Sequence, residues 1–192
     1  MSGFDLAPLQ DLVSDVLQDR DEQRLKEFID KVDLYIIVEE SADVDSFPDS
    51  VLDFILKLMG QEMFLTMEGS SKLLLVLETD WSGLREEQRR NLLHSIGSSY
   101  GRFKDWMSSF ILSELLGQYY CNRDAFQLLT QLKSTSEITA RSLVAHGFEH
   151  IAREAEDKSL RDQAVSQLKS MKLDPSPEVQ NEAAVALAKI GN

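Results

Sequence analysis

The spacing of the apolar residues limits this chain to a helical fold. Nearly every apolar segment repeats at steps of three and four residues, the period with which one face of an α-helix returns. The first such stripe consists of Leu6, Leu9, Leu12, Val13, Val16 and Leu17, and a second runs from Leu25 to Ile36. The compact apolar runs at 35–38 and 73–77 find no convincing strand elsewhere to pair with, so we expect them to be helical as well.

Capping residues and helix breakers predict where these helices begin and end. Pro48 and Gly60 bound a third helix, and Gly69 divides residues 63–77 into two short helices or a helix and a loop. The N-caps expected for later helices are Asp105, Asn122, Ser136 and Ser176. Further helices are expected at 84–100, 106–119, 122–132, 136–153, 160–171 and 177–190. The sequence therefore predicts an all-α fold of about nine or ten antiparallel helices joined by short turns.

Length and composition are those of one ordinary globular domain. At 192 residues, 43% hydrophobic and 28% charged, the chain is large enough to fill a single core, so we expect one helical domain over 1–192. A lone cysteine, Cys121, cannot form an internal disulfide. The N-terminus lacks the pattern of a signal peptide, and the longest strongly apolar run is far shorter than the roughly 20 residues of a bilayer span. These features predict a cytoplasmic protein.

Negative charge is concentrated in the first third of the chain. Residues 1–66 carry sixteen acidic side chains and five basic ones, whereas the remaining residues hold seventeen acids and fifteen bases. No basic residue lies between Lys31 and Lys57. The acidic residues in that gap are Asp33, Glu39, Glu40, Asp43, Asp45, Asp49 and Asp53.

This charge distribution narrows the class of partner. A strongly negative surface repels nucleic-acid phosphates and anionic lipids and attracts cationic surfaces. We therefore expect a basic protein partner, with no direct contact to nucleic acid and none to a membrane. Trp81 and Trp106 are candidate aromatic anchors for such a partner, because tryptophan is enriched in interface hot spots. Most of the other aromatic residues between 100 and 120 have core spacing.

Eighteen residues near the C-terminus, 174–191, carry a recognisable pattern. They combine an Asp174-Pro175 turn, a Pro177-Glu178-Val179 helix start, an Ala183-Ala184 pair and a Leu187-Ala188-Lys189-Ile190-Gly191 ending. This segment resembles the second half of a HEAT repeat. Setting Ala145 against Ala184 gives a period of 39 residues, close to the ~40–47 of that class. The resemblance is strongest over 135–192 and implies antiparallel helix pairs stacked as an irregular right-handed α-solenoid.

The resemblance leaves several functions open. HEAT-like DNA glycosylases use a basic concave surface, and this chain has the opposite charge. HEAT-like bilin lyases need a site for an acidic tetrapyrrole, which the sequence does not offer. In size, charge and helical class the chain is similar to bacterial immunity proteins that neutralise contact-delivered toxins.

Candidate chemical residues are few. His146 and His150 lie four apart on a predicted helix, the spacing at which two imidazoles can share a metal, with His94 as a third histidine that the fold would have to supply. The order of residues is not that of a zincin, because Gly147 follows the first histidine. Cys121 has no base beside it in sequence to activate the thiol.

We therefore expect a protein-binding module without enzymatic activity, cofactor or metal, and in its most specific form an immunity protein that covers the cleft of a basic nuclease toxin. A scaffold or adaptor is the alternative in the same class. A helical-repeat lyase or other enzyme with a pocket between helices, using the His146/His150 pair, is the alternative in another.

Overall fold

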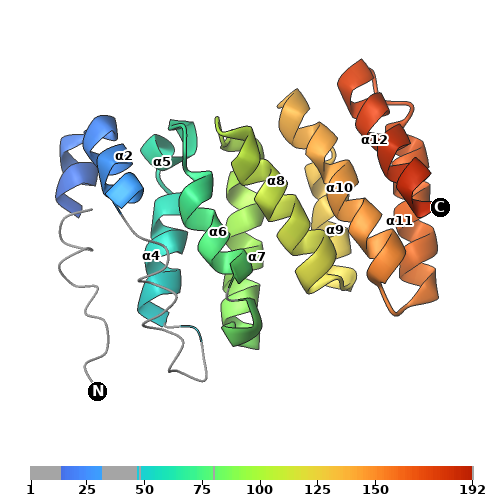
Figure 1. Cartoon of the computed structure of the whole chain (residues 1–192), viewed down its shortest axis with the longest axis horizontal. Helices are drawn as coiled ribbons and strands as arrows, with labels where there is room; N and C mark the ends of the chain where they lie inside the picture. The colour runs from blue at the N-terminus through green and yellow to red at the C-terminus, as the bar shows by residue number, and fades with distance from the viewer. Residues whose placement is uncertain (1–13, 32–46, 48, 80, 192) are drawn as a thin grey trace. The chain divides into compact units, whose positions relative to one another are not determined.

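The computed structural model describes residues 14–31, 47, 49–79 and 81–191, and this part of the chain is helical, with no strand (Figure 1). The predicted all-α class is confirmed. The chain divides into two compact units, unit 1 at 1–105 and unit 2 at 106–192. The expectation of one folding domain stays a prediction, as does that of stacked antiparallel pairs.

Unit 1 is built from short helices around a leucine-rich and phenylalanine-rich core. Helix α4 packs against α5 and α7, and α2 packs against α5 and α6. Leu25, Ile55, Leu58, Phe64 and Leu73 are completely buried. The elements are α2 (Glu22–Lys31), α4 (Asp49–Met59), α5 (Glu62–Thr66), α6 (Ser71–Thr79), the 3-10 turn η1 (Trp81–Gly83), α7 (Glu86–Ser99) and the 3-10 turn η2 (Tyr100–Arg102).

Two predicted helix boundaries in unit 1 are confirmed. Helix α4 ends at Met59, directly before Gly60. Gly69 has a φ of 90°, a conformation that glycine tolerates at no steric cost, and it separates α5 from α6. The run at 73–77 is helical, as predicted. The carboxylate of Asp105 accepts hydrogen bonds from the backbone N–H groups of Gly69 and Ser71, at 3.2 and 3.1 Å, and so fixes this turn.

Unit 2 is organised around its longest helix. Helix α10 packs against every other element of the unit. Its buried face includes Val144, Phe148 and Ile151, each with no exposed surface. The elements are α8 (Trp106–Glu114), the π-helical segment η3 (Leu115–Tyr120), α9 (Arg123–Leu132), α10 (Ile138–Glu154), α11 (Lys158–Met171) and α12 (Pro177–Ile190).

Two glycines bring η3 and α10 into backbone contact. A Cβ atom added to Gly117 would lie 2.4 Å from the carbonyl oxygen of Gly147 and 2.7 Å from its Cα. A Cβ on Gly147 would lie 2.8 Å from Leu129 Cδ2 and 2.9 Å from the Ser113 carbonyl oxygen. Only glycine permits this approach at both positions. The pair therefore sets the separation between α10 and the C-terminal end of α8.

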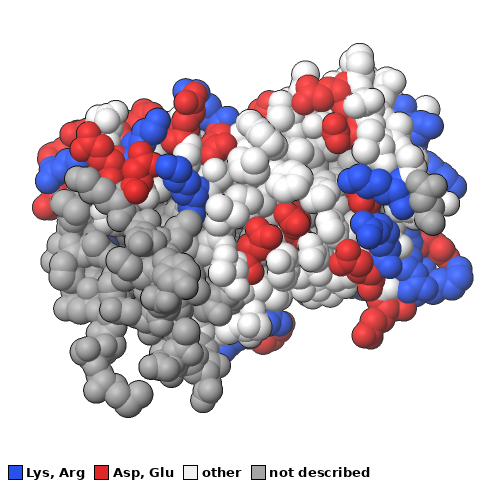
Figure 2. Space-filling view, viewed as in Figure 1, with Lys and Arg blue, Asp and Glu red and all other residues white. Residues whose placement is uncertain are grey.

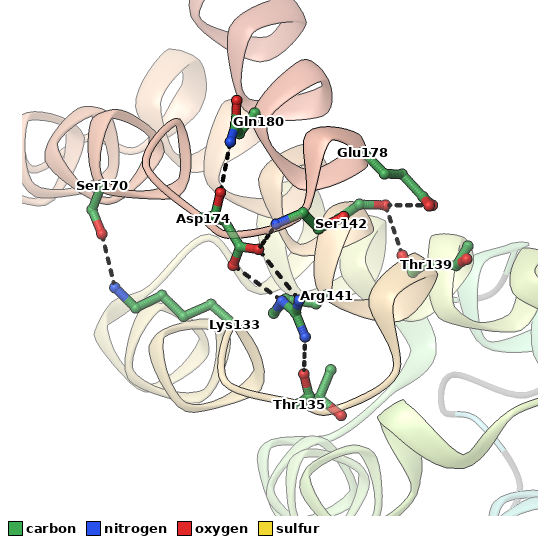
Figure 3. Close-up of polar contacts among 10 residues, drawn as sticks. Lys133, Thr135, Thr139, Arg141, Ser142, Ser170, Asp174, Glu178 and Gln180 are labelled. Carbon is green, nitrogen blue, oxygen red and sulfur yellow. Dashed lines mark hydrogen bonds and ion pairs between the residues drawn. The ribbon is translucent and has the colours of Figure 1, made fainter.

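The last three helices begin in a similar way, and Figure 3 shows the starts of α10 and α12. Their N-caps are Glu137, Asp157 and Ser176, spaced by twenty and nineteen residues. The residue four positions after each N-cap has a long side chain. This side chain donates a hydrogen bond to the backbone carbonyl oxygen of the residue six positions before its own. The donors and acceptors are Arg141 to Thr135, Arg161 to Ala155 and Gln180 to Asp174. At this end of the chain a similar helix start thus recurs every nineteen or twenty residues, which is about half of the 39-residue period.

A part-buried ion pair connects the first and last of these helix starts. Arg141 donates from Nε and Nη2 to the two carboxylate oxygens of Asp174, at 3.1 and 3.3 Å (Figure 3). The Asp174 side chain also accepts from the Ser176 N–H at 2.8 Å. Both charged side chains are about 15% exposed. The turn before α12 is therefore anchored on α10.

One predicted helix cap in unit 2 is wrong, and one predicted helix has the expected extent but changes its type. Glu137, not Ser136, caps α10, because its longer side chain reaches the N–H groups of Thr139 and Ala140. The helix expected at 106–119 changes at Glu114 from α to π, so that Cys121 follows with a φ of 40°. Asn122 caps α9 as predicted, accepting from the Ala125 N–H at 2.9 Å. Across the part of the chain that the structure describes, no helix combines the length and hydropathy that a bilayer span requires.

Candidate functional site

Two of the seven carboxylates in the predicted acidic patch lie in the described part of the chain. Asp53 is exposed on α4. Asp49, at the start of α4, is bound by the Arg85 guanidinium and by Gln88 Nε2. The hydrogen bond from Arg85 is the main cause that lowers the pKa of Asp49. Asp33, Glu39, Glu40, Asp43 and Asp45 lie outside the described residues.

Other acids of unit 1 also pair with bases of the same unit. Asp30 binds Lys72, Glu62 binds Arg102, and Glu68 lies 3.6 Å from Lys104. These side chains are between 44 and 71% exposed. Figure 2 shows acidic and basic side chains intermingled over α2 and α5. Part of the negative charge of unit 1 is therefore balanced locally at its surface.

The two tryptophans have different surroundings. Trp81, in η1, is buried with 9% of its surface exposed, and the Arg89 guanidinium lies 4.9 Å from the centre of its ring. Trp106, the first residue of α8, is 53% exposed and touches Phe110 edge-on. Of the two predicted anchors, only Trp106 presents its ring to solvent. Arg89, on α7, covers the ring of Trp81.

A cluster of metal-ligand side chains lies in unit 2, between α8 and α10. Glu114 is the last residue of α8, and His146 and His150 are one turn apart on α10. One potential ligand atom from each of these three residues lies within 4.8 Å of the other two. His94, the third histidine considered from the sequence, is exposed on α7 in unit 1. The structure thus brings the predicted histidine pair together with a carboxylate that the sequence did not point to.

The two imidazoles of this cluster are held in defined orientations. His146 stacks on Phe110 with ring centres 4.5 Å apart, and its own ring lies 4.6 Å from that of His150. His150 Nδ1 lies 2.9 Å from Glu154 Oε1. His146 Nε2 is buried and has no hydrogen-bond partner among the described residues. A buried nitrogen without a partner costs free energy, so a ligand at this atom is favoured.

Burial keeps His146 uncharged. Desolvation, followed by the neighbouring His150, lowers the pKa of His146 to about 4, although the carboxylates of Glu149 and Glu154 act in the opposite direction. At neutral pH this imidazole therefore carries a free lone pair and no positive charge. That is the protonation state in which histidine binds a metal.

Glu149, on the same helix, is committed elsewhere. Its side chain is 3% exposed and accepts from Arg153 at 3.2 Å and from Lys189 at 2.9 Å. Its distance to His146 Nδ1 is 3.9 Å. The two basic side chains balance this buried carboxylate and attach α12 to α10. Glu149 therefore acts as an ion-pair partner and not as a member of the ligand cluster.

Cys121 lies at the rim of an open pocket of about 470 Å³ between the start of α9 and the turn before α11. Burial, and then the charge of Glu154, raises the pKa of the Cys121 thiol. A thiol protonated at neutral pH is a poor nucleophile. The pocket is lined by Cys121, Asn122, Arg123, Glu154, Ala155, Glu156, Asp157 and Leu160.

Comparison with known proteins gives no family for the chain. No family model matches it, and neither the curated proteins nor the solved structures contain a match to it.

The sequence contained part of the signal for the ligand cluster. The spacing of His146 and His150 placed both on one helical face. Glu114 lies 32 residues earlier, and its position depends on the π-helical segment and on the contact between Gly117 and Gly147. Gly117 and Gly147 lie in two helical segments that α9 separates in the sequence, and a glycine within each segment is the local feature that could have indicated so close a crossing.

Proposed function

We propose that this protein binds a basic protein partner through unit 1. The observation that supports the proposal most directly is the division of charge between the two units. Unit 1 carries twenty-two acidic and eleven basic side chains, whereas unit 2 carries eleven and nine. The difference makes unit 1 the region that attracts a cationic surface over distances of about 10 Å at physiological salt.

The ion pairs of unit 1 reduce this field without abolishing it. Exposed pairs such as Glu62 with Arg102 are weak, typically worth about 0–1 kcal/mol, so an arriving lysine or arginine can replace the internal base at little cost. Carboxylates without an ion pair also contribute to the negative field of unit 1. Asp53 on α4 is exposed, and the described residues provide it with no ion pair. The remaining excess of eleven acids has to be balanced by solvent cations or by a partner.

In its most specific form the partner is a basic nuclease toxin, and this chain is its immunity protein. The size of the chain, its helical class and its charge support this form. The mechanism is electrostatic occlusion: carboxylates occupy the cleft that otherwise binds phosphate, and charge complementarity speeds the encounter. A HEAT-like scaffold that recruits a basic protein is the second form, supported by the recurring helix starts of α10 to α12.

The test compares two variants of equal charge change. Asp43→Asn, Asp45→Asn and Asp53→Asn together remove three charges from unit 1. Asp124→Asn, Glu156→Gln and Asp162→Asn remove three from unit 2. Affinity for a purified basic ribonuclease is measured by calorimetry at low and high salt.

We expect the unit 1 variant to bind at least about tenfold more weakly at low salt, and the unit 2 variant to bind within about twofold of the parent chain. Equal losses in both variants, or binding that does not weaken with salt, would contradict the proposal. Protection of cells that express a toxin encoded beside this chain would separate the immunity form from the scaffold form.

A further inference from the structure

We propose that Glu114, His146 and His150 form a binding site for one divalent transition-metal ion of the zinc class. The proposal concerns unit 2 and does not depend on the partner proposed for unit 1. It rests on the donor set, on the positions of the three side chains and on a buried nitrogen to which the described residues offer no hydrogen bond.

The donor set selects the class of metal. Two imidazoles and one carboxylate are ligands typical of zinc and of similar first-row ions. Calcium and magnesium prefer oxygen ligands and rarely take imidazole. Three protein ligands leave a fourth position for water or for a donor from another molecule. The three residues thus supply enough ligands to hold one ion.

The distances are close to those that a metal requires. Around a tetrahedral ion with bonds of about 2.1 Å, ligand atoms lie roughly 3.4 Å apart. The potential ligand atoms here lie within 4.8 Å of one another. Closing the site therefore needs these separations to shorten by at most about 1.4 Å, a change that side-chain torsions can supply.

The backbones are held by the glycine contact. Gly117 and Gly147 fix the approach of η3 to α10, and each belongs to an element that carries a ligand or directly continues one. Gly147 is adjacent to His146, and Gly117 lies three residues after Glu114. The cluster is therefore placed by rigid elements and not by a loop, which favours a preorganised site.

Groups around the cluster orient the two imidazoles. Glu154 engages Nδ1 of His150 at 2.9 Å, which leaves Nε2 of that ring as the ligand atom. A carboxylate behind a ligand histidine is the usual supporting contact in zinc sites. For His146, Nε2 is the buried atom without a partner, and Phe110 stacks on the ring and limits its rotation.

The test is a titration of the full chain, freed of metal by a chelator, with Zn²⁺ by calorimetry and with Co²⁺ by visible absorption. We expect binding of about one ion per chain and the absorption bands of a tetrahedral Co²⁺ site. His146→Gln and Glu114→Gln should each weaken binding at least about a hundredfold. Glu154→Gln, which changes only the supporting contact, should weaken it about tenfold.

His94→Ala is the matched control, because this histidine is exposed and belongs to unit 1. It should leave the affinity unchanged. Circular dichroism and thermal unfolding without metal establish that each variant folds. Zn²⁺ should raise the unfolding temperature of the parent chain and of His94→Ala, but not that of His146→Gln. Failure of the parent chain to bind one ion, or an affinity in His146→Gln within about threefold of the parent, would overturn the proposal.

Discussion

Exposed ion pairs occur in both units of this protein, but among the described residues only unit 2 also has ion pairs with largely buried carboxylates. In unit 1 the ion pairs lie at the surface, and the side chains of Glu62 and Arg102 are 68 and 50% exposed. In unit 2 the pair of Arg141 with Asp174 is about 15% exposed, and Glu149 is almost completely buried between Arg153 and Lys189. Surface pairs leave a field that other molecules can sense, whereas buried pairs fix the positions of helices.

The difference extends to backbone packing. Unit 1 joins short helices through turns such as the one at Gly69, and the longest of those with described bounds, α7, has fourteen residues. Unit 2 surrounds a seventeen-residue helix with elements that approach as closely as two facing glycines permit. We infer that unit 1 is suited to meeting a partner and unit 2 to holding side chains in a fixed geometry.

The glycine contact gives the largest expected effect. Gly117→Ala places a methyl group 2.4 Å from a backbone oxygen, which no side-chain rotation can relieve. We expect a loss of about 3 kcal/mol in the free energy of unfolding, measured with chemical denaturant. Gly191→Ala is the control, because its added methyl group would meet no atom closer than 3.7 Å. A loss below about 1 kcal/mol in Gly117→Ala would mean that the two elements are not locked together.

The part-buried ion pair of unit 2 comes next. Arg141→Ala leaves the Asp174 carboxylate without its guanidinium and the Thr135 carbonyl without its donor. We expect a loss of about 2–3 kcal/mol in the free energy of unfolding. A double-mutant cycle with Asp174→Ala should give a coupling energy above about 1 kcal/mol. Additive losses in the cycle would show that the pair does not anchor the start of α12.

The stability of unit 2 should depend on pH through His146. Its pKa is about 4 in the folded chain and about 6.5 when unfolded, so the unfolded state binds the proton first as the pH falls. The contribution of the neutral His146 to the free energy of unfolding is complete above pH 6.5 and is lost between about pH 6.5 and 4. We measure the free energy of unfolding with chelator present. Between pH 7 and 4.5 it should fall by about 2 kcal/mol more in the parent chain than in His146→Gln. Parallel curves for the two proteins would contradict this assignment.

Much of the local structure followed from the sequence because it depends on neighbouring residues. Gly60, Asn122 and Pro177 end, cap and begin the helices that the pattern predicted. What the sequence did not indicate depends on contacts between distant segments. The π-helical turn after Glu114 is one example, and the pairing of Arg141 with Asp174, 33 residues apart, is another.

The ligand cluster combines both kinds of information. The helical period places His146 and His150 on one face, so this part of the cluster could be predicted from the sequence. The carboxylate of Glu114 joins them only because two helices cross at a pair of glycines. Sequence spacing can therefore find ligands on one helix, whereas a ligand from a second helix requires the packing to be known.

The smallest expected effect completes the comparison of the units. Arg102→Ala in unit 1 removes the same kind of side chain as Arg141→Ala, but from a pair in which both members are at least half exposed. Water replaces the lost contact, so we expect the free energy of unfolding to change by less than about 1 kcal/mol. The same substitution raises the net negative charge of unit 1, and affinity for a basic protein at low salt should therefore increase slightly. If Arg102→Ala instead destabilised the chain as strongly as Arg141→Ala, the surface pairs of unit 1 would be structural, and its carboxylates would not be available to a partner.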